Sequence, residues 1–114
     1  YGFNNPTPKA DETYGYEFWV TIPDEMEVPE PLQKKSFAGG LYAAHCIKMG
    51  DFHEWQLFMQ WLMNSQEYEY DEREPLGMGG SLEEHLNAYS YFECDEETAK
   101  VIQLDLLMPI RERR

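Results

Sequence analysis

Three ionisable side chains stand next to one another in the segment GGSLEEHLN, which covers residues 79–87: Glu83, Glu84 and His85. The segment reads as a short β-strand, and successive side chains of a strand point to opposite faces of the sheet. Glu83 and His85 therefore share one face, while Glu84 shares the other with the leucines. A carboxylate beside an imidazole can bind a cation, hydrogen-bond a ligand or act as an acid–base pair.

The remaining histidines and the two cysteines predict no metal site and no cofactor. No pair of histidines has the i, i+4 spacing with which one helix binds a metal ion. Cys46 and Cys94 are too few and too far apart for a disulfide framework or a zinc site. Cys46 lies in an apolar, strand-like run, so we expect it to be a buried, reduced thiol.

Composition limits the kinds of function that this chain can have. Its 114 residues are enough for a single domain, residues 1–114, with one modest core. The 22 acidic and 9 basic residues give a net charge of −13, which argues against nucleic-acid or anionic-membrane binding. No apolar run is long enough to cross a bilayer, and no signal peptide is visible, so we expect a cytoplasmic protein.

The first half of the chain predicts β-structure. After an irregular lead-in over residues 1–14, the β-prone run YEFWVTIP at 16–23 predicts a strand that ends at Pro23. A proline-rich loop follows at 24–31. Residues 32–49 then predict a β-hairpin, in which two strands flank Gly39 and Gly40, because paired glycines supply the positive φ of a tight turn.

One helix is clear, at residues 50–66, with Asp51 as its expected N-cap. Its apolar residues recur every three or four positions, as on the buried face of a helix: Phe52, Trp55, Phe58, Met59 and Leu62, with Trp61 widening the stripe. A charged loop at 67–80, the strand of the opening segment, an acidic connection at 93–100 and a last strand at 102–110 ending near Pro109 complete the chain. This order predicts an α+β fold, an antiparallel sheet with one helix packed on one face.

Five of these segments, taken in order, resemble the GyrI-like small-molecule-binding domain, the family of the effector-binding domains of bacterial transcription regulators and of the gyrase-inhibitor protein. They are YEFWVTIP, FAGGLYAAH, GDFHEWQLFMQWL, LEEHLN and QLDLLMPI, and the resemblance covers residues 14–112. It implies two pseudo-symmetric halves and a ligand cleft between the sheet and the helices. It also implies that Glu83 lines that cleft, with His85 where an aromatic residue is common.

The resemblance also has a gap. A full member of the family has another strand and helix before the lead-in YGFNNP, and these are missing here. Either the upstream half has been removed, or this protein completes its cleft with a second subunit as a homodimer. Regulators of the family carry a DNA-binding helix-turn-helix further upstream, so these 114 residues are not expected to contact DNA.

The resulting hypothesis is a multidrug-type effector-binding domain, from or related to a bacterial transcription regulator, that captures lipophilic and cationic aromatic compounds without changing them. A half-buried glutamate selects a cation, and aromatic rings add cation–π attraction. We expect four aromatic residues to line the site with Glu83 and His85: Trp19, Tyr42, Trp55 and Trp61. No catalytic residue is assigned.

Two alternatives remain open. The first is a small hydrolase of electrophilic compounds, in which Glu83 is the base and Tyr42 or His85 its partner, because some relatives in the family are hydrolases of this kind. The second is a protein–protein inhibitor that resembles the gyrase-inhibitor branch, whose acidic surface would suit a basic partner.

Overall fold

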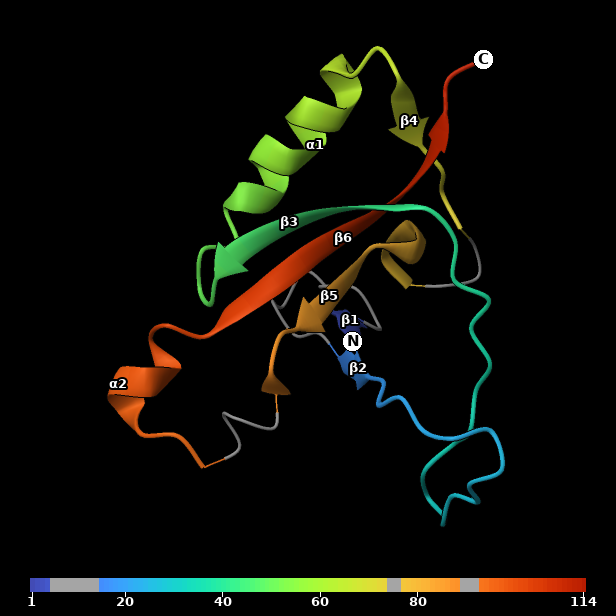
Figure 1. The fold of residues 1–114 in the computed structure, drawn as a ribbon, viewed down its shortest axis with the longest axis vertical. Coiled ribbons are helices and arrows are strands. Elements are labelled where there is room, and N and C mark those ends of the chain that lie inside the picture. The colour runs from blue at the N-terminus through green and yellow to red at the C-terminus, as the bar shows by residue number, and fades with distance from the viewer. Residues whose placement is uncertain (5–14, 74–76, 89–92) are drawn as a thin grey trace.

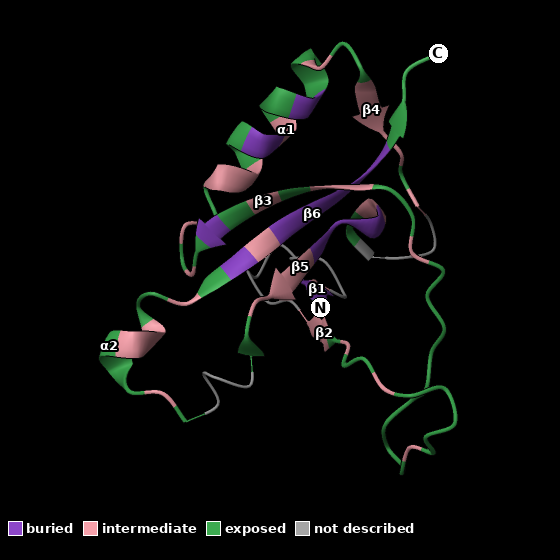
Figure 2. Ribbon diagram, in the orientation of Figure 1, coloured by how far each residue is buried: buried purple, intermediate pink, exposed green. Residues whose placement is uncertain are grey.

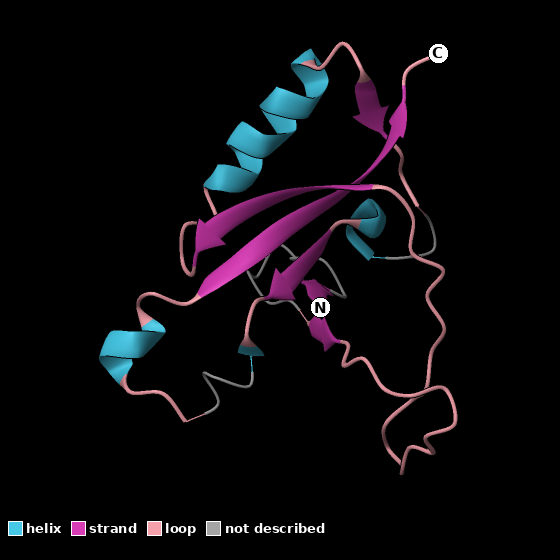
Figure 3. Ribbon diagram, in the orientation of Figure 1, coloured by secondary structure: helices cyan, strands magenta, loops and turns pink. Residues whose placement is uncertain are grey.

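The computed structural model describes residues 1–4, 15–73, 77–88 and 93–114 (Figure 1). Over these residues the chain forms a six-stranded antiparallel sheet, two α-helices and one short 3-10 helix, η1 (Figure 3). This confirms the expected α+β class with an antiparallel sheet. The elements are β1 (Gly2–Asn4), β2 (Tyr16–Phe18), β3 (Tyr42–Lys48), α1 (Glu54–Asn64), β4 (Tyr68–Tyr70), η1 (Gly77–Gly80), β5 (Leu82–His85), α2 (Glu96–Ala99) and β6 (Gln103–Glu112).

The sheet has the strand order β2-β1-β5-β6-β3, and β4 pairs with the C-terminal end of β6. In one row across the sheet, Phe18 lies opposite Gly2, Gly2 opposite Glu83, and Glu83 opposite Leu106. The row ends at His45 on β3. Residues paired in register point to the same face, so this row fixes what lies beside Glu83.

The main core lies between α1 and the half of the sheet made by β6 and β3. Phe58 and Leu62 of α1 are buried against residues of these strands. In Figure 1, α1 lies beside β3 and β6, whereas β5, β1 and β2 extend from the other side of β6. The buried strand residues of this core are Ile47, Leu104, Leu106, Met108 and Ile110, and β6 carries the longest buried stretch in Figure 2.

A smaller core lies on the opposite face of the sheet. It contains the buried side chains of Phe3, Leu82 and Leu107, and the partly buried rings of Trp19 and Tyr42 pack against them. The alternation predicted for the opening segment is therefore confirmed, because Leu82 is buried on this face and Glu83 points to the face that carries α1.

Two of the strand predictions are wrong. The predicted strand at 16–23 keeps only three residues, and Val20 beyond it is exposed. The hairpin at 32–49 is not formed either. Gly39 and Gly40 do adopt positive φ, but only β3 follows them, and it pairs with β6, about sixty residues away along the chain. The long-range apolar pairing with β6 replaces the local pairing that the glycines favour.

The helix prediction is correct in its centre and wrong in its start, its cap and one flank. α1 covers residues 54–64 of the predicted 50–66, and its N-cap is His53 rather than Asp51 and makes no side-chain cap bond. Oε1 of Glu54, the first residue of α1, lies 2.9 Å from Nε2 of His45 on β3. Trp61, expected to widen the buried stripe, is 54% exposed, because the buried face is limited to the side that meets β6 and β3.

The ends of the chain differ from the prediction as well. β1 lies inside the lead-in that was expected to be irregular, while residues 5–14 of that lead-in lie outside the described residues. β6 does not stop near Pro109 but runs on to Glu112, because its last residues pair with β4. Cys46 is exposed rather than buried, since β3 is an edge strand and Cys46 points away from α1.

Candidate functional site

On one face of the sheet, Glu83 lies at the boundary between the half that α1 covers and the half that no described helix covers. Its neighbour across β6, Leu106, is fully buried in the core under α1. Its neighbour on the other side is Gly2 of β1. Ser81 and Leu82 are buried and hold the start of β5 in place, so the half-buried Glu83 carboxylate has a fixed backbone support.

The Tyr16 hydroxyl donates a hydrogen bond of 3.0 Å to Glu83 Oε1. To reach Glu83, the Tyr16 ring crosses β1 directly above Gly2. A Cβ atom added at Gly2 would overlap the Tyr16 ring and its hydroxyl. The glycine therefore has a steric role, because it leaves the space that lets an aromatic hydroxyl on β2 bind a carboxylate on β5.

Burial raises the pKa of the Glu83 carboxyl above its usual value, because the charged form loses contact with water. The Tyr16 hydrogen bond and the nearby imidazole of His85 act in the opposite direction and offset part of the rise in pKa. A cation that docks against Glu83 would lower the pKa further, so cation binding and ionisation of this carboxyl are linked.

Two more side chains complete this part of the sheet. Phe18 of β2 packs edge-on against Tyr16, with ring centroids 4.7 Å apart, and lies 5.9 Å from the ring of His85. His85 Nε2 is buried and has no hydrogen-bond partner among the described residues. We refer to Tyr16, Phe18, Glu83 and His85 together as the Glu83 surface. It combines one acid, one imidazole and two aromatic rings.

The structure brings only some of the predicted site residues together. Glu83 and His85 lie side by side as predicted, two positions apart on β5. Trp19 and Tyr42 pack in the smaller core on the opposite face of the sheet, away from Glu83. Trp55 packs partly buried against the main core, and Trp61 lies on the exposed side of α1.

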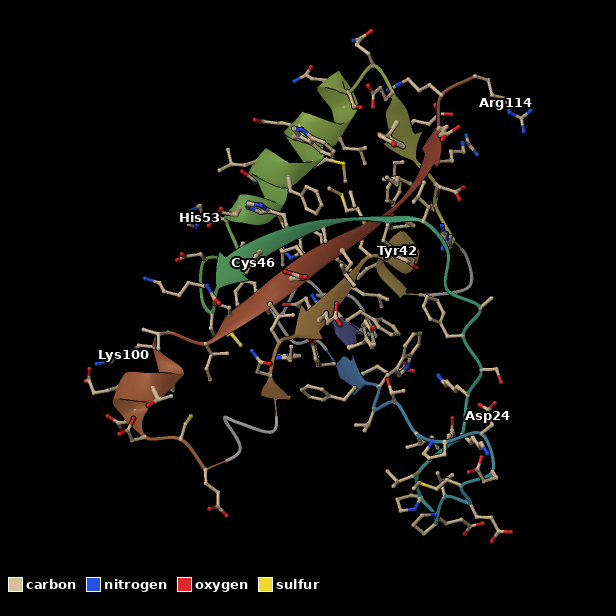
Figure 4. All side chains as sticks on the ribbon, in the orientation of Figure 1. Asp24, Tyr42, Cys46, His53, Lys100 and Arg114 are labelled. Carbon is tan, nitrogen blue, oxygen red and sulfur yellow. The ribbon has the colours of Figure 1, made fainter. Side chains whose placement is uncertain are left out.

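The ring of Tyr42 already has a cation over it. The Arg73 guanidinium lies 4.7 Å from the centroid of the Tyr42 ring and donates hydrogen bonds to the carbonyls of Gly39 and Leu41. Figure 4 labels Tyr42 at the start of β3. A ligand cation would therefore have to displace Arg73 to use this ring, which argues against Tyr42 as part of a cation site.

Tyr16 and Phe18 are the residues that the sequence did not assign to the site. Alternation along 16–23 does place them on one face, but which strand lies beside them depends on the register of β1 with β2 and β5. Glycine at position 2 was the available signal, since a glycine inside a strand often marks the close approach of another group.

A hollow of about 430 Å³ lies elsewhere, at the end of the sheet where β4 pairs with β6. It is lined by Glu69, Arg111, Arg113 and Arg114, and does not include Glu83. Figure 4 labels Arg114 at this end of the chain. In the described part of the chain, no group of three or more metal-ligating side chains is close enough to bind a metal ion. No helix among the described residues is long and apolar enough to span a membrane.

Comparison with known protein families finds a match over most of the chain. The model of the family named Cass2, described as an integron-associated effector binding protein, matches residues 1–110. The match spans nearly the whole chain and confirms the resemblance to the GyrI-like effector-binding proteins. No curated protein and no solved structure matches the chain.

Proposed function

Since the chain belongs to the Cass2 family of integron-associated effector-binding proteins, which bind small molecules, we propose that its Glu83 surface binds an aromatic cation. The observation that carries the proposal is the hydrogen bond of 3.0 Å from Tyr16 to the half-buried Glu83 carboxylate. That bond orients the acid, and a bound cation supplies a charge partner, since no lysine or arginine in the described part of the chain forms a salt bridge with Glu83.

Charge and chemistry both favour this ligand class. The net charge of −13 attracts cations to the protein as a whole. At the Glu83 surface, the rings of Tyr16 and Phe18 offer faces for stacking and for cation–π attraction of about 0.5–2 kcal/mol each. Beside these rings, the buried Nε2 of His85 has no hydrogen-bond partner in the described part of the chain, and a ligand that reached it could form one hydrogen bond. A bound ligand would stabilise one arrangement of the sheet and the helix. A regulator or partner protein that contacts this domain would then respond to the arrangement that the ligand favours.

The proposal is tested by isothermal titration with N-methyl-phenylpyridinium and its uncharged parent, phenylpyridine, at neutral pH. The two compounds have nearly the same shape, so the difference between them measures the contribution of charge. We expect the cation to bind and the neutral parent to bind much more weakly. A Glu83→Gln variant should lose about 10- to 100-fold in affinity for the cation, the range expected for a hydrogen-bonded charge pair.

Glu84→Gln is the matched control, because Glu84 is the next residue on β5 and points to the opposite face. It removes the same charge from the chain and should leave the affinity almost unchanged. Equal losses in the two variants would show that only the overall acidity attracts the cation, and equal binding of the cation and phenylpyridine would refute the proposal.

A hydrolase is the second candidate, because the carboxylate of Glu83 and the hydroxyl of Tyr16 form the type of pair that activates water. In that case Tyr16 takes the place expected for Tyr42, which packs on the opposite face of the sheet, while His85 stays beside Glu83. Proteins of this family are typically binding proteins, which favours the first candidate. Turnover of an epoxide such as styrene oxide to its diol, lost in both Glu83→Gln and Tyr16→Phe, would favour the hydrolase.

A further inference from the structure

Three of the nine basic residues of this acidic chain line the hollow at the end of the sheet where β4 pairs with β6 (Figure 1). Arg111 lies opposite Glu69, and the backbone N–H of Arg113 donates a hydrogen bond of 2.8 Å to the carbonyl of Glu67, which extends this pairing. Arg111 and Arg113 are two positions apart on extended chain, so their side chains leave the same face. The hollow therefore has two guanidinium groups from one strand face, and Arg114 lines it as well.

The acids beside this hollow do not balance its arginines. Nε of Arg111 lies 3.0 Å from Oε1 of Glu69, and Nη1 of Arg113 lies 3.5 Å from Oε2 of the same carboxylate. Nη1 of Arg111 is 3.5 Å from Oδ1 of Asp71. Arg114 forms no ion pair with any residue that the structure describes. Over the described ion pairs, three guanidinium groups therefore share two carboxylates, which leaves one positive charge without a counter-ion.

Arg111 and Arg113 also keep most of their N–H groups available to a ligand. A guanidinium has five N–H donors in one plane. Within the described part of the chain, Arg111 donates only its Nε–H, to Glu69, and Arg113 only its Nε–H, to the carbonyl of Ser65 at 2.9 Å. The side chains are 60% and 40% exposed, so the Nη donors of both arginines can be reached from solvent.

The unused donors and the surplus charge together define a class of ligand. The planar fork of arginine binds oxyanions through pairs of charge-assisted hydrogen bonds. A phosphate group carries nearly two negative charges at neutral pH and has three acceptor oxygens, so it can bind two arginines at once. The hollow holds about 430 Å³, within the range of about 300–1,000 Å³ that is typical of small-ligand sites. We propose that this hollow binds a phosphate group, either free or at the end of a small molecule.

This site is separate from the Glu83 surface and does not depend on the proposed function. Ile110 is buried in the main core under α1, so the neighbouring Arg111 points to the opposite side of β6. Glu83, in contrast, points to the face that carries α1. The net charge of −13 disfavours non-specific binding of anions to the rest of the surface. Saturable binding of phosphate would therefore report a local site.

Isothermal titration of the chain with inorganic phosphate, at neutral pH and constant ionic strength, tests the site. We expect saturable binding of one phosphate with a Kd of about 1 mM or lower. Arg113→Gln should weaken binding about 10-fold or more, the loss expected for a charged hydrogen-bond donor. Lys100→Gln is the matched control, because it removes the same charge from a side chain that is 68% exposed at the end of α2, and it should keep the affinity. No saturation by about 10 mM phosphate, or equal weakening by the two variants, would overturn the inference.

Glu69→Gln tests the site in the opposite direction. Glu69 pairs with both Arg111 and Arg113, so its neutralisation frees both guanidinium groups and should tighten phosphate binding about 5-fold or more. A gain in affinity cannot result from loss of folding. Glu112→Gln is the matched control, because Glu112 pairs with Tyr68, which packs against the main core on the other side of the strand. Equal gains in the two variants would show that only the overall charge matters, and would overturn the site.

Two further ligands identify the group that is bound. Glycerol 3-phosphate that binds more tightly than inorganic phosphate would assign the hollow to a small organic phosphate, whereas equal or weaker binding would assign it to free phosphate. Acetate carries a single charge and should bind about 10-fold more weakly than phosphate, because it offers fewer acceptor oxygens to the two arginines. Acetate that binds as tightly as phosphate would refute the phosphate assignment.

Discussion

Tyr16 and Glu83, which are 67 positions apart in the sequence, are joined by a hydrogen bond that crosses the intervening strand β1 above Gly2. The bond couples an edge strand to the interior of the sheet. It also offsets part of the rise in the pKa of Glu83 that burial causes. The contact therefore links the acidity of Glu83 to the pairing of β2 and β5 with β1.

Tyr16→Phe should shift the pH dependence of cation binding. Under the proposed function the cation pairs with an ionised Glu83, so its affinity should fall as the pH drops through the pKa of this carboxyl. Removing the hydroxyl removes an interaction that lowers this pKa, so the acid midpoint should move to higher pH. Isothermal titration of N-methyl-phenylpyridinium from pH 4 to pH 8 measures the midpoint in both proteins. An unchanged or lower midpoint in the variant would contradict the role of the bond.

Gly2→Ala should break the hydrogen bond between Tyr16 and Glu83, because the Tyr16 ring passes over residue 2. The added methyl group overlaps the Tyr16 ring, which must leave its place over β1. We expect a loss of about 1–3 kcal/mol in the free energy of unfolding, as for other cases of overpacking. The acid midpoint of cation binding should move in the same direction as in Tyr16→Phe. Urea denaturation gives the stability, and Gly50→Ala, where nothing lies within 4 Å of the added methyl group, is the control for backbone effects alone.

Gly50 has a positive φ of 100°, so its substitution carries a backbone cost of its own but no overlap with another side chain. We expect Gly50→Ala to lose stability but to keep the acid midpoint of cation binding, and Gly2→Ala to shift this midpoint. This pair of results would assign the shift to the displaced ring of Tyr16. If Gly2→Ala leaves both stability and midpoint unchanged, the ring does not depend on the glycine.

Local patterns in the sequence were sufficient for the elements with strong periodicity. The stripe that includes Phe58 and Leu62 predicted α1, and alternation in the opening segment placed Glu83 opposite Leu82. Both features depend on side chains close together in the sequence, where the periods of helix and strand apply. The family, too, followed from the order of such segments.

Pairing between distant strands was beyond the reach of these patterns. The two glycines 39 and 40 favoured a local hairpin, yet β3 pairs with β6. Trp19 was assigned to the site because it is a large ring on a polar strand face, but Phe3 on β1 provides its packing surface. In the same way Tyr16 escaped notice, because only the register across β1 brings it to Glu83.

Leu106→Ala should be among the most destabilising single substitutions in the chain. Leu106 is fully buried beneath α1 and lies between Glu83 and His45 in the sheet. Truncating such a residue removes buried apolar surface and leaves a cavity, at a cost of about 2–5 kcal/mol. Met63→Ala, on the exposed side of α1, should change stability by about 0.5 kcal/mol or less. Urea midpoints of the two variants measure the contrast, and similar losses would show that α1 does not pack on this row.

Glu83→Gln should change how stability depends on pH. Because burial raises the pKa of Glu83 in the folded state, the folded chain holds this proton more tightly than the unfolded chain does. The resulting stabilisation is fully present below the unfolded pKa and is lost as the pH rises through the folded pKa. Glutamine does not titrate, so the variant does not lose this stabilisation. Its free energy of unfolding relative to the natural chain should therefore rise with pH between the unfolded and the folded pKa of Glu83, and then level off. Urea denaturation of both proteins at closely spaced pH values gives the free energy of unfolding of the variant minus that of the natural chain. The contributions of the other carboxylates cancel in this difference. A difference that falls with rising pH would mean that the folded state favours the charged form of Glu83.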